Sequence, residues 1–565
     1  MFVRRQIATS VLMAASLGSV SYLYADDAHD FNGHNGIQHV LLISIDGMHA
    51  LDFENCMNSN TCPTLKNLAK NGVNYTRTST SRPSDSFPGL MAIVTGGTPK
   101  TVGAYYDVAY DRVLAPPKID TGNGLVHGDC FQGHPNGTRT EYEEGVDIDQ
   151  TLLTGGSPLY TNPIDGGFLS INPDRLPRDP LDGCEPVYPW NFIRANTIFG
   201  VIHKANGYTA WADKHAVYAA VSGPTGTSTP SNVDDYYAPD INSNVVPLSI
   251  TTASGVNCAT IPISGDWTTG FDSVKCNDQL KVNAVLNWIN GKTHLSGKSA
   301  PVPAIFGMNF QAVSVGQKLV KGTEKGGYTD AAGTPTPDML AEIKFVDAAI
   351  EQMVDALSAQ RLLNSTVIII TAKHGQSPID TNRFFPIPGS SGLNGTPPSG
   401  VLGSAYLPDS EINGIGPTED DISLLWLKPG ADTVSAVAAL ESNAAAAGIG
   451  QIFYGPYIQT IYGTPGLPDT GGDPRVPDII VQPNVGLVYT GSTKKQSEHG
   501  GFAQDDTNVM MLVSNPQIDA KTVTSFVETT QVAPTILSIL GLDPNDLTAV
   551  QAEGTPVLPG LSIGH

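Results

Sequence analysis

Three almost continuous apolar runs constrain the fold of this chain more than any other feature. They occupy residues 40–45, 304–310 and 367–370. Runs of this kind fit central strands of a parallel sheet, because helices cover both faces of such a sheet. Helical patterns lie between them, and the clearest spans residues 337–362, where apolar residues recur every three or four positions. We therefore predict an α/β fold with a mostly parallel central sheet and helices on both faces.

Three long intervals interrupt this alternation of strands and helices. Residues 112–190, 214–300 and 376–475 are rich in Gly, Pro, Ser, Thr and Asn. Loops of such length in a compact domain are usually functional. We expect them to be insertions over one edge of the sheet, where they could form a lid, within a single domain that spans residues 37–565.

The beginning of the chain has the pattern of an export signal. Residues 1–25 contain two arginines followed by a mainly apolar run, which is typical of a cleavable secretory signal, and residues 26–36 are polar, as in a flexible leader. Six cysteines fit an oxidising compartment. Their simplest pairing joins neighbours in the sequence, although other connectivities remain open: Cys56 with Cys62, Cys130 with Cys184 and Cys258 with Cys276. We expect a secreted or periplasmic protein.

The charge balance excludes some classes of partner. Lys and Arg total 31 and Asp and Glu total 54, which gives a net charge of −23 at pH 7. A strongly acidic chain is repelled by nucleic-acid backbones and by anionic membrane surfaces. Beyond residue 25, no stretch is apolar enough to span a bilayer. We expect no nucleic-acid-binding surface and no membrane segment besides the signal.

Polar groups stand where ligands bind in a parallel sheet, beyond the carboxyl ends of the strands. Asp46 follows the first apolar run, and His374 follows the run at 367–370. Ser86 precedes a helix that Pro88 opens, and a helix N-terminus favours an oxyanion or a phosphate. Each residue taken singly is an ordinary turn, cap or loop residue. Their joint placement predicts an anion site at this edge.

At these residues the chain resembles the alkaline phosphatase superfamily, specifically its nucleotide pyrophosphatase/phosphodiesterase branch. The resemblance implies an alkaline-phosphatase-like fold, a small-molecule ester substrate and Ser86 as the nucleophile, since the family has Thr or Ser there. It runs in ordered blocks from about residue 37 to residue 560. These blocks are a first metal-binding segment at 43–48, a nucleophile segment at 84–88 running on to 94–99, a Ser-Asp-His-Gly-like segment at 371–375, a late His-Gly at 499–500 and a closing helix at 531–542.

The family holds two zinc ions, and part of its ligand set is preserved here. By resemblance, Asp46, His374 and His499 are the remaining metal ligands. Lys373, however, stands where the family has an Asp of the second site. Zinc binds neutral imidazole and anionic carboxylate or thiolate, and a protonated lysine is repelled.

An Asp-x-x-x-His pair of the family is missing as well. Gln311 and Val315 occupy its positions, and a register two residues later offers Val313 and Gln317 instead. Neither register supplies the pair. We therefore expect no standard two-zinc site and at most one divalent ion, with zinc as the first choice.

Three interpretations of the altered site remain. In the first, the chain is a hydrolase that works with one ion or none. Ser86 then forms a covalent intermediate, and Lys373 replaces the charge of a lost metal or serves as the base for Ser86. We assign Asp107 and Gln311 to substrate binding in this interpretation.

In the second, the chain is a pseudoenzyme that binds an anionic or sugar ligand. In the third, a metal site is rebuilt from nearby groups such as His49, Asp85, Asp107, Asp213, His215 and Glu498. Sulfatase chemistry is not supported, since Leu90 stands where that branch requires an arginine.

Overall fold

The computed structural model describes residues 31, 33–142, 149, 167–243, 250–262, 265–295, 298–387, 395–409 and 417–562. The predicted signal at 1–25 lies outside the described residues. All statements below concern the described part of the chain.

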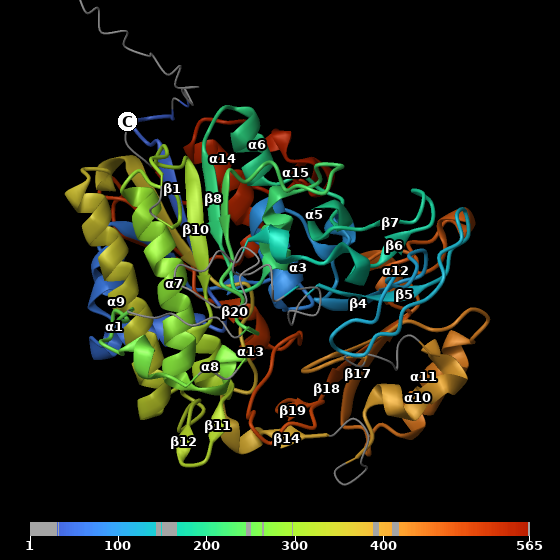
Figure 1. Ribbon diagram of the computed structural model, residues 1–565. Helices are drawn as coiled ribbons and strands as arrows, with labels where there is room; N and C mark the ends of the chain where they lie inside the picture. Colours follow the sequence, from blue (N-terminus) through green and yellow to red (C-terminus); the bar gives the residue numbers. More distant parts are fainter. Residues whose placement is uncertain are drawn as a thin grey trace, which may run out of the picture.

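An eight-stranded sheet forms the centre of the molecule, with β1, β10 and β8 side by side in Figure 1. Its strands run parallel to their neighbours except β21, which is antiparallel to both β2 and β13. The mostly parallel sheet predicted from the apolar runs is therefore confirmed. In spatial order the strands are β22 (Lys521–Val523), β2 (Gly72–Tyr75), β21 (Leu512–Ser514), β13 (Thr366–Thr371), β1 (His39–Ile45), β10 (Ile305–Phe310), β8 (Thr209–Ala212) and β9 (Asp235–Tyr237).

Strand β1 occupies an interior place because its sequence suits burial on both faces. All seven of its residues are buried. It pairs in parallel with β10 on one side and with β13 on the other, so that Leu42 faces Gly307 and Ile369 across the two ladders. Because β13, β1, β10 and β8 run in the same direction, their carboxyl ends lie along one edge of the sheet.

Two groups of helices cover the sheet (Figure 1). The long helix α9 (Pro337–Ala359) confirms the predicted 3.6-residue pattern, and its cap residue Thr336 accepts a hydrogen bond from the Met339 amide at 3.2 Å. The first group packs around this helix and comprises α1 (Ala50–Ser59), α2 (Pro63–Ala69), α7 (Phe271–Ile289) and α8 (Ala312–Lys318). The second group comprises α3 (Ser86–Thr95), α4 (Pro99–Val102), α6 (Ile198–Lys204), α14 (Val532–Ile539) and α15 (Thr548–Glu553).

A second, antiparallel sheet lies beside the main one, largely within the predicted insertion 376–475. Residues alternate between its two faces, as a strand requires. Ile479 and Val481 pack with Leu440, whereas Ile480 packs on the other face with Trp426. The sheet is formed by β15 (Thr418–Glu419), β16 (Ser423–Leu425), β18 (Ile479–Pro483) and β17 (Ile449–Tyr454), and is accompanied by α10 (Pro398–Tyr406), α11 (Thr433–Ser442) and α12 (Pro456–Ile461).

The remaining elements are short. They include β4 (Val108–Asp111), β5 (Thr138–Glu141) and α13 (Gln504–Thr507). The others are α5 (Pro189–Phe192), β3 (Thr78–Ser79), β20 (Asn508–Val509), β23 (Val527–Glu528) and the two-stranded pairs β6 (Arg178–Asp179) with β7 (Glu185–Pro186), β11 (Val320–Lys321) with β12 (Glu324–Lys325), and β14 (Phe385–Pro386) with β19 (Leu487–Val488).

The three disulfides join the cysteines that the sequence pairing predicts. They are Cys56–Cys62, Cys130–Cys184 and Cys258–Cys276, and they account for all six cysteines. None of the helices in the described ranges combines the length and the hydropathy needed to cross a membrane.

Candidate active site

The carboxyl-terminal edge of the sheet gathers the polar residues that the sequence singles out. Asp46 follows β1, and both Lys373 and His374 follow β13. Asp213 and Lys214 follow β8 in the same way. Parallel strands thus deliver side chains from distant parts of the chain to one place, as expected for this class of sheet.

Ser86 is the first residue of α3, and Asp85 is the residue that caps this helix. One Asp85 carboxylate oxygen accepts hydrogen bonds from the Phe87 amide at 3.2 Å and from the Asp107 amide at 3.0 Å. The Ser86 hydroxyl is therefore free from the capping role that a serine before a helix usually has. It lies in the first turn, where the helix dipole stabilises negative charge.

Lys214 contacts the candidate nucleophile directly. Its ammonium group donates a hydrogen bond to the Ser86 Oγ at 3.2 Å and lies 3.9 Å from the Asp46 Oδ2. Ser86 itself has no exposed surface, whereas Lys214 is 5% exposed and lines a cavity. The lysine therefore stands between that cavity and the serine.

Lys373 forms the fully buried floor of the site. Its ammonium group lies 3.3 Å from the Asp46 Oδ2 and 3.5 Å from the Asp213 Oδ1, and it sits over the Tyr218 ring at 4.2 Å. Burial by itself would raise the pKa of Asp46, but the charges of Lys373, His374 and Lys214 outweigh burial and hold this pKa far below its usual value. Asp46 is therefore a carboxylate between cations.

Two histidines face each other beside Asp46. The His374 and His499 ring centroids are 4.0 Å apart, and the His374 Nε2 lies 3.7 Å from the Asp46 Oδ2. The His499 Nδ1 lies 3.5 Å from the Asp85 Oδ1. Burial and the neighbouring His374 and Lys318 lower the pKa of His499 well below its usual value, so its imidazole is neutral at neutral pH.

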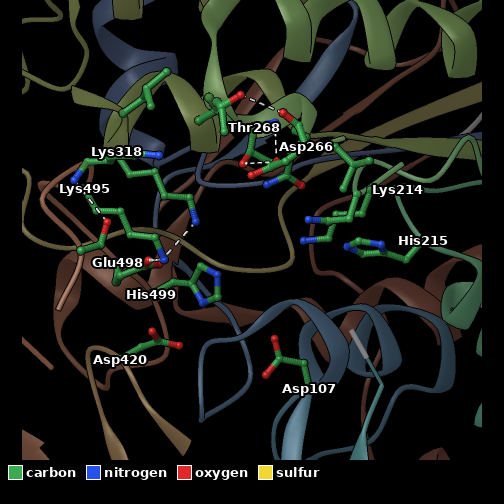
Figure 2. Close-up of a pocket in the computed structure, with 18 residues that line it drawn as sticks. Asp107, Lys214, His215, Asp266, Thr268, Lys318, Asp420, Lys495, Glu498 and His499 are labelled. Atoms are coloured by element: carbon green, nitrogen blue, oxygen red, sulfur yellow. Dashed lines mark hydrogen bonds and ion pairs between the residues drawn. The ribbon is translucent and has the colours of Figure 1, made fainter. Parts of the chain in front are cut away.

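A cavity of about 320 Å³ opens above these residues (Figure 2). The two predicted substrate-binding residues, Asp107 and Gln311, both line it, together with Lys214 and His499. The backbone at Gln311 is fixed because the buried Asp278 carboxylate accepts hydrogen bonds from its amide at 2.9–3.0 Å. The cavity therefore brings the predicted substrate residues together with Lys214 and His499, whereas the predicted catalytic residues Ser86 and Lys373 are buried and are not part of its lining.

The far wall of the cavity carries an ion cluster. Glu498 pairs with Lys318 at 3.3 Å and also with Lys495 (Figure 2). Burial would raise the pKa of Glu498, but the two lysines hold it at about 2. Glu498 is thus charged at neutral pH and neutralises part of the positive charge around it.

The residues at the edge do not fit the two zinc ions that the resemblance implies. Gln311 and Val315 occupy the positions of the family's Asp-x-x-x-His pair in one alignment. Both line the cavity, and neither offers an anionic or imidazole donor. Gln317 of the second register lies behind the Asp46 loop, where its amide donates to the Gly47 carbonyl at 2.7 Å. The ammonium groups of Lys214 and Lys373 lie where a cation would bind Asp46.

A metal site rebuilt from nearby residues is not assembled either. Asp213 contacts Lys373, and Glu498 contacts two lysines. His215 pairs with Asp240 at 3.1 Å, and His49 pairs with Asp52 at 2.9 Å. In the part of the chain that the structure covers, no three His, Cys, Asp or Glu side chains are grouped so as to hold a metal ion.

Lys214 is the site residue that the sequence reasoning missed. It follows β8 just as Asp46 follows β1 and His374 follows β13, and this position is the signal that the sequence offers. Its neighbours Asp213 and His215 are among the expected ligands of a rebuilt metal site, whereas a lysine is not a metal ligand.

Comparisons with known proteins identify the family of the chain. The family model for type I phosphodiesterase/nucleotide pyrophosphatase matches residues 40–505. The chain therefore belongs to this family, as the resemblance predicted, and it is by family a phosphodiesterase-like hydrolase of ester bonds. No curated protein sequence matches the chain at a significant level.

Solved structures of ectonucleotide pyrophosphatase/phosphodiesterase 5 are similar in fold. The inactive murine protein in complex with AMP matches with a TM-score of 0.50 and 14% identity, covering 90% of this chain and 96% of the other. Another structure of the murine protein matches with a TM-score of 0.49 and 14% identity, covering 90% of this chain and 96% of the other. The human protein matches with a TM-score of 0.45 and 14% identity over 89% and 95%.

Proposed function

We propose that this chain is an exported hydrolase that cleaves a phosphoric or related ester through Ser86 without the zinc pair of its family. One observation carries the proposal: Lys214 contacts the Ser86 hydroxyl at 3.2 Å, beside a second lysine buried against Asp46. Lysine and serine form the reactive pair of other hydrolases on unrelated folds.

The reaction has two steps in which this chain's own residues act. In its neutral form, Lys214 takes the proton of the Ser86 hydroxyl while the Ser86 oxygen attacks the ester centre, and the bond to the leaving alcohol breaks. The proton then passes to the leaving alcohol. Water cleaves the resulting seryl ester, which restores the Ser86 hydroxyl and releases the acid.

Negative charge that develops on the ester is stabilised from two directions. Ser86 lies at the N-terminal, positive end of the α3 dipole, and Lys373 supplies a fixed positive charge from the floor. We therefore assign Lys373 to electrostatic stabilisation and Lys214 to the role of the base.

A small anionic ester suits the site. The cavity holds about 320 Å³, and the similar murine protein was solved in complex with AMP. The net charge of −23 disfavours nucleic acid and anionic membranes as partners. Three disulfides support an oxidising, secreted or periplasmic location, in keeping with a signal at residues 1–25.

A pseudoenzyme is the second candidate, and the full burial of Ser86 beneath Lys214 favours it. In the hydrolase, the Lys214 side chain must make room for the ester while its nitrogen stays within reach of the Ser86 hydroxyl. A pseudoenzyme would keep it closed and bind its ligand in the cavity alone.

Turnover separates the two candidates. Purified mature protein is assayed with p-nitrophenyl phosphodiesters, phosphomonoesters and carboxylic esters, beside Ser86→Ala and the exposed control Ser442→Ala. The hydrolase requires activity that falls by roughly 10³-fold or more in Ser86→Ala and persists in Ser442→Ala. Equal activity in Ser86→Ala contradicts the role of Ser86, and an inactive wild type that gains thermal stability from a ligand identifies a pseudoenzyme.

A further inference from the structure

The cavity beside Ser86 is lined mainly by groups that hydrogen-bond to hydroxyls. They come from several separate segments: Asp107 before β4, Asn242 and Asp266 after β9, Gln311 at the start of α8, and Asp420 in the second sheet region. Thr268 and Thr269 add hydroxyls, and the Thr268 hydroxyl donates to the Asp266 carboxylate at 2.7 Å. Figure 2 shows the carboxylates of Asp107 and Asp420 on one side of the space and that of Asp266 on the other.

A surface on which a nucleobase would stack is missing from this lining. Among the described residues that line the cavity there is no Phe, Tyr or Trp. Stacking on such rings is the usual, sequence-tolerant way to hold a base. The two lining histidines already have a ring partner each, His499 against His374 and His215 against Tyr218.

Gln311 offers an acceptor that the protein does not use. Its Oε1 is buried and has no hydrogen-bond partner, and the residue is only 4% exposed. A buried acceptor without a donor is unfavourable, so the position is suited to a ligand that brings a hydroxyl or an amine hydrogen. Asp278 fixes the backbone of Gln311 and Ala312 and so holds this residue at the cavity wall.

The positive charge on the far wall is compensated in part. Glu498 pairs with both Lys318 and Lys495 and offsets one of their two charges, and Lys494 also lines this wall. Carboxylates and amides of this kind, without aromatic rings, match the several hydroxyls of a sugar or another polyol.

The geometry points to a substrate whose alcohol part is a sugar or similar polyol, held by Gln311 and Asp107, rather than a nucleoside. This inference rests on the proposed function for the position of the reacting ester beside Ser86. It specifies the substrate further, since it names the class of alcohol that the ester carries.

Two diesters with the same leaving group test the inference: glucose 6-(p-nitrophenyl phosphate) and thymidine 5′-(p-nitrophenyl phosphate). We expect kcat/KM to be at least roughly tenfold higher for the glucose ester, since unpaired polar groups of a site discriminate strongly. In Gln311→Ala this ratio should fall toward one. The matched control Gln360→Ala removes an exposed amide that contacts Asn290 and should keep the ratio.

A binding measurement keeps the inference separate from catalysis. Calorimetry on Ser86→Ala protein compares glucose 6-(methyl phosphate) with thymidine 5′-(methyl phosphate), and the glucose ester should bind more tightly by a similar factor. Tighter binding of the glucose ester together with an inactive wild type would refute the proposed function and uphold the inference. Equal or tighter binding of the thymidine ester, or binding of neither, overturns the inference.

Discussion

The Lys214 ammonium group lies 3.2 Å from the Ser86 Oγ and 3.9 Å from the Asp46 Oδ2. It therefore joins the candidate nucleophile to the carboxylate that the family resemblance assigns to metal binding. In a metal-dependent relative a cation would occupy such a position, and here a side chain of the protein itself supplies both the charge and a titratable nitrogen.

The first prediction concerns the two roles of that nitrogen. Lys214→Ala should lower kcat/KM by roughly 10²- to 10⁴-fold, the range of a positioned general base. Lys214→Arg keeps the charge, but a guanidinium does not deprotonate in proteins, so it should not restore the rate. Steady-state kinetics beside the exposed control Lys344→Ala measures both. A Lys214→Arg enzyme close to wild type would show that the charge alone matters.

The second prediction concerns the buried ion pair of Lys373 and Asp46, whose atoms are 3.3 Å apart and fully buried. Lys373→Met leaves the Asp46 carboxylate without its main partner, and removing one member of a buried pair costs roughly 3–5 kcal/mol of unfolding free energy. Urea denaturation measures this loss. The double variant Lys373→Met with Asp46→Asn should recover most of it. If the two single changes simply add, the coupling does not exist.

Much of this edge could be predicted from the sequence because it follows directly from strand positions. Asp46 and His374 come immediately after apolar runs, and β1 and β13 pair in parallel as such runs require. The position of Ser86 at the start of a helix follows from Pro88, whereas its role as the nucleophile is implied by the family resemblance. Local patterns were enough to predict the positions of these residues.

The contacts between those positions could not be predicted, because they depend on how distant segments pack. Nothing local distinguishes Lys214 from its neighbours, and only the docking of β8 beside β10 brings it to Ser86. The apolar residues Ile479, Ile480 and Val481 also form a strand, yet this strand belongs to the second sheet. An apolar run indicates burial and does not say in which sheet the strand lies.

The third prediction concerns metal dependence. Since Lys214 and Lys373 occupy the positive side of the site, incubation with EDTA should leave turnover within roughly twofold of the untreated enzyme. Elemental analysis of the purified protein should accordingly find less than one zinc per chain. Loss of activity on chelation with recovery on added zinc would instead support a single ion on Asp46 and His374, whose Oδ2 and Nε2 are 3.7 Å apart.

The fourth prediction concerns a pair of buried carboxyl groups close to His499. Asp421 and Asp506 are buried, and the Asp421 amide donates to the His499 carbonyl at 3.2 Å. Burial raises the pKa of Asp421 to about 7, although hydrogen bonds from Asp506 and Ser377 act in the opposite direction. Burial and the charge of Asp421 also raise the pKa of Asp506 well above its usual value. The pair therefore retains protons that the unfolded chain has lost by neutral pH.

The free energy of unfolding should consequently fall as the pH rises from about 4, the usual pKa of an aspartate, to about 7, the pKa of Asp421. In this window the folded state binds more protons than the unfolded state. The contribution of Asp421 to this loss is at most roughly 4 kcal/mol. Asp421→Asn keeps the size of the side chain and cannot ionise, so the variant should gain stability relative to wild type at pH 8 and not at pH 4. Urea denaturation at both pH values, with the exposed control Asp519→Asn, measures the difference. A gain of the same size at both pH values would show that the titration of Asp421 is not its cause.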